Sequence, residues 1–441
     1  MLDSKSSATE SSSASLSITS AISSLKFPFK LTKDQIEAVD AWTTNGYRGS
    51  IIYSTGTGKT EIAFECAKRA AEARDDNSSF NILFLVPRIV LVQQNINRLI
   101  KYGIPVDRVG AYFGERKEIR EITISTYQSA ISDPDLINSS NMIIFDEVHL
   151  VSDTATTLRK VLTAADTKKP LLGLTATIDE QDPRYNTILS LLPPVRRYMI
   201  SDAVKDKRLA RPVVIPIKVD LTHDEKKTYV GCSIKIRNIS GYLHTSDPKS
   251  ITFMLRRGGR SAELARSWFA NVKERKNLIN CAKNKLLAAV DIIATKHPSE
   301  RIMVFSETIE SIQKLKEMLQ NKGIKSMLID SKLSSKKRQN ILSEWGKEYF
   351  PLLSVHTLEI GYDVPEVRLA IILATSSNMN QIVQRIGRTL RKTADTALIY
   401  TIYLSHTHDF GTLKMVRQAT NVEHENKDPT VSDSNLDRYV L

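Results

Sequence analysis

Short apolar runs rich in Val, Ile, Leu and Phe alternate with longer amphipathic stretches over most of the chain. A short apolar run bounded by polar or glycine residues predicts a buried strand, and apolar positions at helical spacing predict a helix. In the first part of the chain, strands are predicted at Ser50–Ser54, Asn81–Val86, Val109–Tyr112, Glu121–Ser125, Met142–Asp146 and Leu171–Thr175. Because helical stretches separate most of these strands, we expect a parallel sheet with helices on both faces.

The alternation stops at Pro193-Pro194 and resumes near Arg301. Between these points, residues 195–220 are expected to form a connector with short strands. Helical spacing over Ser261–Ile293 then predicts helices. Turns or mobile segments are expected before these helices, around Gly241, Pro248 and Gly258-Gly259.

The second alternating part predicts another α/β unit. Its strands are expected at Arg301–Phe305, Ser326–Ile329, Leu352–His356, Leu369–Ala374 and Ala397–Tyr403. Its helices are expected at Thr308–Asn321, Ser335–Trp345 and Asn378–Leu390. The predicted fold class is therefore α/β, with two doubly wound parallel-sheet domains and a helical insert between them.

Composition is that of an ordinary globular protein, with 41% hydrophobic and 25% charged residues among 441. The cysteines Cys66, Cys232 and Cys281 are far apart and include no CxxC pair, which fits a reducing compartment. No apolar run approaches the length of a membrane span, and the N-terminus shows no signal-peptide pattern. About half of residues 1–24 are Ser, which predicts a disordered lead.

The chain is strongly basic, with a net charge of +13 and an isoelectric point near 9.4. Residues 225–285 alone hold 14 Lys and Arg against 4 Asp and Glu. Such a stretch favours a polyanionic partner, although it is also compatible with a merely solvated face. His406, His408 and Asp409 lie close in sequence, but without a further ligand a metal-free loop is the favoured interpretation.

The most specific chemical signal is the run Ser54-Thr-Gly-Thr-Gly-Lys-Thr60 between a predicted strand and a helical stretch. Glycines in such a loop let backbone N–H groups surround a nucleotide's phosphates at a helix N-terminus. We expect Lys59 to reach the β- and γ-phosphates and the Thr60 hydroxyl to hold Mg²⁺. Tyr53 occupies the position of the first glycine in the general GxxxxGK[ST] pattern. The predicted ligands are ATP and Mg²⁺, with the phosphates on Thr55, Gly56, Thr57, Gly58, Lys59 and Thr60.

A second signal is the pair of carboxylates, Asp146 and Glu147, at the end of the apolar run 142–145. Ligands of doubly wound sheets bind at the carboxyl ends of strands. Asp146 is expected to hold Mg²⁺, and Glu147 is expected to orient or deprotonate the water that attacks the γ-phosphate. An acidic pair can also simply mark a strand end, but its position after a phosphate loop favours catalysis.

These motifs, with others in the same order, resemble those of superfamily 2 helicases from about residue 27 to 404. The loop at 54–60 and the sequence Asp146-Glu-Val-His149 resemble motifs I and II. The other motif-like segments are Val86–Arg88 with Gln93, Thr126–Gln128, Gly173–Thr177, Ile302–Ser306, Thr357–Pro365 and Gln384–Arg391. The resemblance implies two RecA-like domains that bind ATP and a nucleic acid.

The resemblance also implies roles for individual residues. In the last motif, Arg388 and Arg391 are three residues apart on one helical face and suit the charge of a departing γ-phosphate, with Gln384 beside them. Gln35 would read the adenine, with Phe27 or Phe29 stacked on the ring. Further nucleotide contacts are implied at Gly361 and Asp363. Nucleic-acid contacts are implied at Pro87, Arg88, Gln93, Thr126, Tyr127, Gln128 and Thr357.

Within the superfamily, the Asp-Glu-Val-His box and the basic helical insert resemble the XPB-type branch of DNA repair helicases, in particular its short archaeal members. In that branch the insert is called a thumb and contacts DNA, which implies contacts from Arg256, Arg257 and Arg260. Trp268 and Phe269 could stack on bases, but packing inside the insert is the favoured interpretation. The branch's Arg-Glu-Asp motif corresponds here to Glu180-Gln-Asp182, and Hef-like and restriction-type translocases remain close neighbours.

The expected domains are a disordered lead (1–26), a first RecA-like domain (27–200), a connector with the thumb-like insert (201–295), a second RecA-like domain (296–418) and a flexible tail (419–441). The expected function is ATP-dependent 3′-to-5′ movement on DNA, or its unwinding, in repair or recombination. An RNA helicase and a nucleic-acid scaffold with a degenerate motor are the alternatives. The expected partner is single-stranded or forked DNA, bound by a monomer inside the cell, at the nucleoid or in a nucleus, with a nuclease as a further partner.

Overall fold

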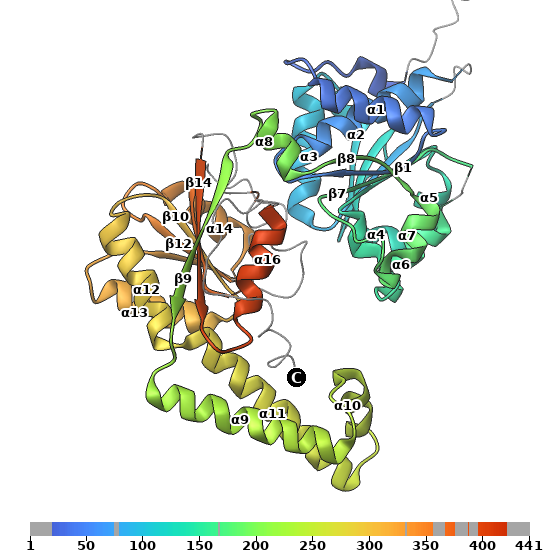
Figure 1. Cartoon of the computed structure of the whole chain (residues 1–441). Helices are drawn as coiled ribbons and strands as arrows, with labels where there is room; N and C mark the ends of the chain where they lie inside the picture. Colours follow the sequence, from blue (N-terminus) through green and yellow to red (C-terminus); the bar gives the residue numbers. More distant parts are fainter. Residues whose placement is uncertain are drawn as a thin grey trace, which may run out of the picture. The chain divides into compact units, whose positions relative to one another are not determined.

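The computed structural model describes residues 20–74, 79–165, 168–330, 333–355, 367–374, 387 and 396–420. These residues group into two compact units (Figure 1). One unit holds most of the first sheet, and the other holds the insert and the second sheet. Among the described residues, no helix has the length and apolar character needed to cross a membrane.

The first sheet has eight strands in the order β4-β3-β5-β2-β6-β7-β1-β8. Strand β2 pairs in parallel with β5 and β6, and β3 pairs in parallel with β5. The bounds are β1 Arg48–Tyr53, β2 Ile82–Val86, β3 Val109–Phe113, β4 Arg116–Lys117, β5 Ile122–Thr126, β6 Met142–Asp146, β7 Leu171–Thr175 and β8 Pro194–Tyr198. All six predicted strands are confirmed. The edge strand β4 was not predicted, and β8 was expected only as a short strand of the connector, because both are polar and largely exposed or half-buried.

The helices of this part are α1 Lys33–Thr44, α2 Lys59–Glu72, α3 Ile89–Lys101, α4 Tyr127–Ile131, α5 Pro134–Asn138, α6 Thr156–Ala164, α7 Asn186–Leu191 and α8 Ile200–Lys205. Helix α3 shows why they form, since it buries Val92, Ile96 and Leu99 on one face and exposes Gln93 and Ile100 on the other. The buried β2, β5 and β6 strands form the core under such helices.

The N-terminal lead is only partly as predicted. Residues 1–19 lie outside the described part, but from Ser20 the chain is packed, and Ala21, Ile22 and Leu25 are buried. The Glu121 carboxylate accepts hydrogen bonds from Ser20 Oγ (2.8 Å) and the Ala21 N–H (2.6 Å). The prediction of disorder up to residue 26 is therefore wrong for residues 20–26.

The second sheet has six parallel strands in the order β11-β12-β10-β13-β14-β9. The bounds are β9 Arg211–Val219, β10 Ile302–Ser306, β11 Met327–Ile329, β12 Pro351–Val355, β13 Leu369–Ile372 and β14 Thr396–Leu404. The five strands predicted after residue 300 are confirmed. Strand β9 confirms the short strand predicted at Pro212–Val219 of the connector. It is not part of a separate connector, because it pairs with β14 along its whole length and forms an edge of this sheet.

The helices of the second α/β part are α13 Ile309–Gln320, α14 Ser335–Glu344 and α16 Phe410–Thr420. They confirm two of the three predicted helices and add α16. The third, at 378–390, lies outside the described residues apart from Gly387, which is helical. Residues 421–441 of the predicted tail also lie outside the described part.

The insert consists of α9 His223–Leu243, α10 Pro248–Leu255, α11 Gly259–Cys281 and α12 Lys283–Asp291, followed by a π-helical turn at Ile292–Lys296. Figure 1 shows α9 and α11 side by side, with α10 at the end far from the second sheet. The turn predicted around Gly241 is wrong, because α9 continues to Leu243, whereas the turns predicted around Pro248 and Gly258-Gly259 are confirmed at the breaks between helices. The start of α9 was readable in the sequence, because Thr222 and Glu225 form a capping box.

Candidate functional site

The predicted phosphate loop joins β1 to α2. Gly56 and Gly58 have φ angles of 86° and 87°, which a side chain would strain. The Lys59 ammonium at the first turn of α2 donates to the Tyr53 carbonyl at 3.0 Å. Thr57 Oγ1 donates to the Ser54 carbonyl at 2.7 Å, which closes the loop on itself. Both glycines thus have positive φ angles, and hydrogen bonds within the loop hold it closed.

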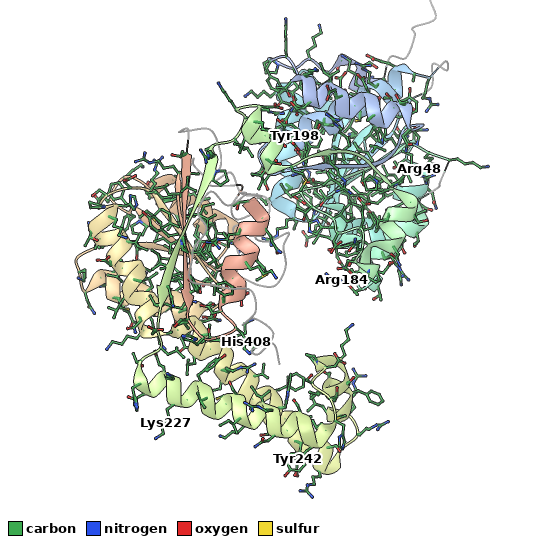
Figure 2. The ribbon with its side chains drawn as sticks, viewed as in Figure 1. Arg48, Arg184, Tyr198, Lys227, Tyr242 and His408 are labelled. Atoms are coloured by element: carbon green, nitrogen blue, oxygen red, sulfur yellow. The ribbon has the colours of Figure 1, made fainter. Side chains whose placement is uncertain are left out.

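Tyr198 and Arg208, which the sequence did not single out, support this loop. Tyr53, at the position of the missing glycine, is fully buried and stacks on Tyr198 with ring centroids 5.1 Å apart. Arg208 donates to the Thr57 carbonyl at 2.7 Å and lies over the Tyr198 ring at 5.7 Å. Figure 2 shows Tyr198 at the end of β8. No sequence signal marks Tyr198 or Arg208, because both are remote from the loop along the chain.

The loop also holds polar atoms that suit a phosphate ligand. Ser54 Oγ and Thr55 Oγ1 are buried and have no hydrogen-bond partner within the described part of the chain. Thr60 is half-buried in the first turn of α2, and Gly56 is exposed. Backbone N–H groups, a lysine and a threonine hydroxyl at a helix N-terminus form a donor set that fits a nucleotide phosphate with Mg²⁺.

The acidic pair ends β6, which lies two strands from β1 in the sheet order. Asp146 is half-buried, and Glu147 is buried in the left-handed conformation, with φ 54° and ψ 51°. A non-glycine residue in this conformation costs of order 1–3 kcal/mol, and such residues gather at functional sites. The nearest Glu147 oxygen lies 3.4 Å from His149 Nδ1 and has no hydrogen-bond partner among the described residues.

Tyr127 corrects one predicted nucleic-acid contact. Its side chain is buried, and its hydroxyl donates to the Asp146 carbonyl at 2.7 Å. Burial, together with the charges of Asp146 and Glu147, raises the pKa of the Tyr127 hydroxyl well above its usual value. The side chain therefore holds the acidic turn in place and is not exposed to a nucleic acid.

Tyr127→Phe should lower the free energy of unfolding by about 1–3 kcal/mol, because the buried Asp146 carbonyl loses a donor. The urea midpoint of the variant would measure this loss. The matched control is Tyr242→Phe, whose hydroxyl is on an exposed side chain, and it should leave the midpoint unchanged. Equal midpoints for Tyr127→Phe and the parent protein would contradict the structural role.

The residues predicted to contact adenine lie in α1 and in the segment before it, and Tyr102 at the end of α3 packs against them. The Gln35 side chain is buried, and its oxygen accepts from the Thr32 N–H at 3.0 Å in a capping box. Phe27 stacks on Phe29 at 5.5 Å, and Phe29 is partly exposed. Tyr102 packs edge-on against both rings, and burial beside Glu61 raises its pKa to about 12. The exposed Phe29 ring is compatible with the predicted stacking on adenine.

The predicted nucleic-acid segments of the first sheet lie at adjacent strand ends. Val86 of β2 is in register with Thr126 of β5, so the segments after these parallel strands leave the sheet side by side. Pro87 and Arg88 are half-buried, whereas Gln93 and Gln128 are exposed. Thr126 is buried, and its hydroxyl accepts from the Ser129 N–H at 3.3 Å as the cap of α4. Exposed contacts are thus available from Gln93 and Gln128.

The residues predicted in the second α/β part fall outside the described residues. They are Thr357, Gly361, Asp363, Gln384, Arg388 and Arg391. In the insert, Arg256, Arg257 and Arg260 are exposed, as a nucleic-acid contact requires. Trp268 is buried and donates to Ser240 Oγ at 2.9 Å, which confirms that it packs the insert's own core.

Two carboxylates of the segment Glu180–Asp182 form ion pairs with arginines. Glu180 pairs with Arg197, and Asp182 accepts from Arg184 Nε at 2.8 Å. Hydrogen bonds from Arg184 hold the pKa of Asp182 below its usual value. Figure 2 shows Arg184 at the surface, so this is an exposed ionic cluster. No group of three His, Cys, Asp or Glu residues placed to hold a metal occurs within the described ranges.

Two protein families match the chain, one in the first α/β part and one in the second. Residues 28–180 match the family described as the res subunit of type III restriction enzymes. Residues 282–393 match the helicase conserved C-terminal domain. The first match covers the phosphate loop and the acidic pair, and the second covers β10 to β13 and the predicted arginine motif.

Two relatives are similar in sequence to this chain over most of its length. A protein of Sulfurisphaera tokodaii, "DNA 3'-5' translocase XPB2", is 28% identical over 87% of this chain and 85% of its own length. A protein of Mycobacterium tuberculosis, "DNA 3'-5' helicase XPB", is 26% identical over 83% of this chain. The chain spans 59% of the length of that mycobacterial relative.

A solved structure shares the fold. The helicase domain of Hef from Pyrococcus furiosus covers 88% of this chain, and 99% of that domain is matched, with a TM-score of 0.56 and 18% identity. It supports two parallel-sheet domains with a helical insert. Together with the phosphate loop and the acidic pair, the two family matches and the XPB-named relatives support an XPB-type helicase of superfamily 2.

Proposed function

We propose that the protein couples ATP hydrolysis to 3′-to-5′ movement along DNA, and that it unwinds DNA during repair or recombination. The observation that carries the proposal is the loop of positive-φ glycines ahead of Lys59, together with the strained acidic turn at Glu147. The names of the archaeal and mycobacterial relatives, a DNA 3'-5' translocase and a DNA 3'-5' helicase, support the same substrate and direction.

In this proposal the first sheet binds the nucleotide. The loop from Thr55 to Gly58 surrounds the phosphates, and Lys59 exchanges the Tyr53 carbonyl for a phosphate oxygen. Thr60 and Asp146 would hold Mg²⁺, which supplies positive charge to the phosphate oxygens when bound. Glu147 accepts a proton from the attacking water or orients it. Gln35 reads the adenine.

The second α/β part completes the site in this proposal. Arg388 and Arg391 stabilise the charge that develops on the γ-phosphate, with Gln384, Gly361 and Asp363 as further contacts. ATP binding closes the two parts, and hydrolysis opens them. Arg88, Gln93, Gln128 and Thr357 then hold one DNA strand, mainly by its phosphates, so we expect little sequence preference.

The cellular setting follows from this substrate. A motor on DNA works in the compartment that contains DNA, which is the nucleoid or a nucleus. Action as a monomer and coupling to a nuclease are further parts of the proposal. Analytical ultracentrifugation on a forked DNA would test the first of these, and co-purification with a nuclease would test the second.

Steady-state ATP hydrolysis should rise strongly when single-stranded or forked DNA is added, and Lys59→Ala should abolish this rise. The reason is that Lys59 is the cation that the loop offers to the transferred phosphate. The measurement compares single-stranded DNA, duplex DNA and RNA at equal nucleotide concentration. The control is Lys33→Ala, which removes an exposed lysine from the first turn of α1.

Each outcome of this assay selects one function. Stimulation by RNA alone would replace the DNA motor with an RNA-dependent ATPase. Absence of hydrolysis with every nucleic acid would favour a binding scaffold with a degenerate motor. The direction is tested separately on biotinylated single strands, where faster displacement of streptavidin from the 5′ end than from the 3′ end would support 3′-to-5′ movement.

A further inference from the structure

The insert exposes two large aromatic rings at its far end. Tyr242, near the end of α9, is 73% exposed, and Phe253 of α10 is 55% exposed. Their neighbours Leu243, Ile251 and Met254 pack in one apolar cluster, so the two rings belong to the same end of the insert. Figure 2 shows Tyr242 at the opposite end of α9 from Lys227. Exposed aromatic rings are the surface on which proteins that bind single strands stack nucleobases.

The insert does not need these rings for its own stability. Its core contains Ile236, Ile239, Ala265 and Trp268. Trp268 meets Phe269 edge-on at 5.0 Å, and Phe269 is half-buried against the same cluster. The aromatic pair that the sequence suggested for base stacking is therefore occupied with packing, whereas Tyr242 and Phe253 face away from the cluster into solvent.

Positive charge surrounds the two rings. Arg257 lies over the Phe253 ring at 4.8 Å from its centroid. Gly258 and Gly259, with φ angles of 73° and 67°, make the turn from α10 into α11, and Arg256 and Arg260 flank that turn. Within the described ranges, none of the three guanidinium groups forms an ion pair. The nearby Asp247 carboxylate is already used, since it caps α10 by accepting from the Ser250 N–H at 2.8 Å.

We infer that Tyr242, Phe253, Arg256, Arg257 and Arg260, here called the aromatic tip, bind unpaired nucleobases of a single strand. Exposed rings stack on base faces of any sequence, and the arginines contact the adjacent phosphates. A duplex hides its base faces inside the stack, so the rings select unpaired DNA. This inference rests on the proposed function and identifies the part of the DNA that the insert recognises.

The test is binding of the full-length protein, without nucleotide, to two fluorescein-labelled single strands of equal length. One strand carries bases, and the other carries an abasic tract with the same phosphates. We expect the parent protein to bind the strand with bases about 10-fold more tightly, since each stacked base contributes of that order. The double variant Tyr242→Ala, Phe253→Ala should bind both strands equally.

Matched variants separate stacking from other effects. Val230→Ala, Ile234→Ala removes apolar side chains of 45% and 46% exposure from the same helix and should leave the preference for bases intact. Tyr242→Phe, Phe253→Tyr keeps both rings and should also retain it. Arg256→Gln, Arg257→Gln, Arg260→Gln should weaken binding to both strands and reduce the dependence of affinity on salt.

Either of two results would overturn the inference: no preference for bases in the parent protein, or an unchanged preference in Tyr242→Ala, Phe253→Ala. In the second case an acidic protein partner becomes the better occupant of the tip. Failure of the inference can be distinguished from failure of the proposed function, because the binding assay uses no ATP. If DNA stimulates hydrolysis but the protein shows no preference for bases, only the aromatic tip is rejected. If the protein prefers bases but DNA does not stimulate hydrolysis, only the DNA motor is rejected.

Discussion

Glu147→Gln should lower DNA-stimulated ATP hydrolysis by about 10²–10⁴-fold while nucleotide binding persists. Glu147 is buried at the turn after β6, and its Oε2 has no hydrogen bond among the described residues. The left-handed backbone at this position shows that the fold tolerates strain there. A glutamine has nearly the same shape but cannot accept a proton from water, so the chemical step loses its base and the phosphate contacts remain.

The measurement is the single-turnover rate of ATP hydrolysis with saturating DNA, beside the affinity for a fluorescent ATP analogue. Glu118→Gln is the matched control, because Glu118 forms an exposed pair with Arg116 and should leave both quantities unchanged. A hydrolysis rate within a few-fold of the parent protein would remove Glu147 from the reaction. A parallel loss of nucleotide affinity would instead indicate damage to the fold.

The second large effect is expected at the base of the insert. Lys285→Met and Asp409→Leu should each lower the free energy of unfolding by about 3–5 kcal/mol, because each leaves an unpaired buried charge. Lys285 Nζ of α12 lies 2.7 Å from Asp409 Oδ2, and both side chains are buried. The same carboxylate oxygen accepts from the Leu404 N–H at 2.9 Å. The pair thus fastens α12 to the segment between β14 and α16.

The double variant Lys285→Met, Asp409→Leu distinguishes a buried pair from ordinary packing. It should lose much less than the sum of the single variants, since no uncompensated charge remains. Urea unfolding of the three variants measures this coupling. The exposed pair Lys325–Glu348 is the control, and its removal should not change the midpoint measurably. Strict additivity of the two single losses would contradict the interaction.

This pair also involves one of the three residues, His406, His408 and Asp409, that lie close together in the sequence of this loop. Asp409 is held by Lys285, and burial together with the nearby Arg275 charge lowers the pKa of His408. Lys285 could not be linked to Asp409 from sequence, because their separation along the chain carries no local signal. The pair forms because α12 packs beside β14 in the folded chain.

Prediction from sequence worked best where the information is local. The phosphate loop needs only a strand, two glycines and a helix start in succession, and these determine the φ angles found at Gly56 and Gly58. The turn predicted at Gly241 is wrong, because α9 continues through this residue. A glycine inside a helix costs only about 1 kcal/mol, and no packing contact is lost at this exposed position, since no atoms surround the place of a side chain.

The sequence alone therefore determined the two α/β units, the phosphate loop and the acidic pair, because strand periodicity and motif spacing are properties of neighbouring residues. The tertiary structure determined which segments and side chains contact one another. It placed β9 beside β14, Arg208 and Tyr198 behind the phosphate loop, and Tyr127 under Asp146. It also buried Trp268 and exposed Tyr242. Such choices depend on packing between segments distant in the chain, and residue type alone does not specify which ring meets the core and which meets solvent.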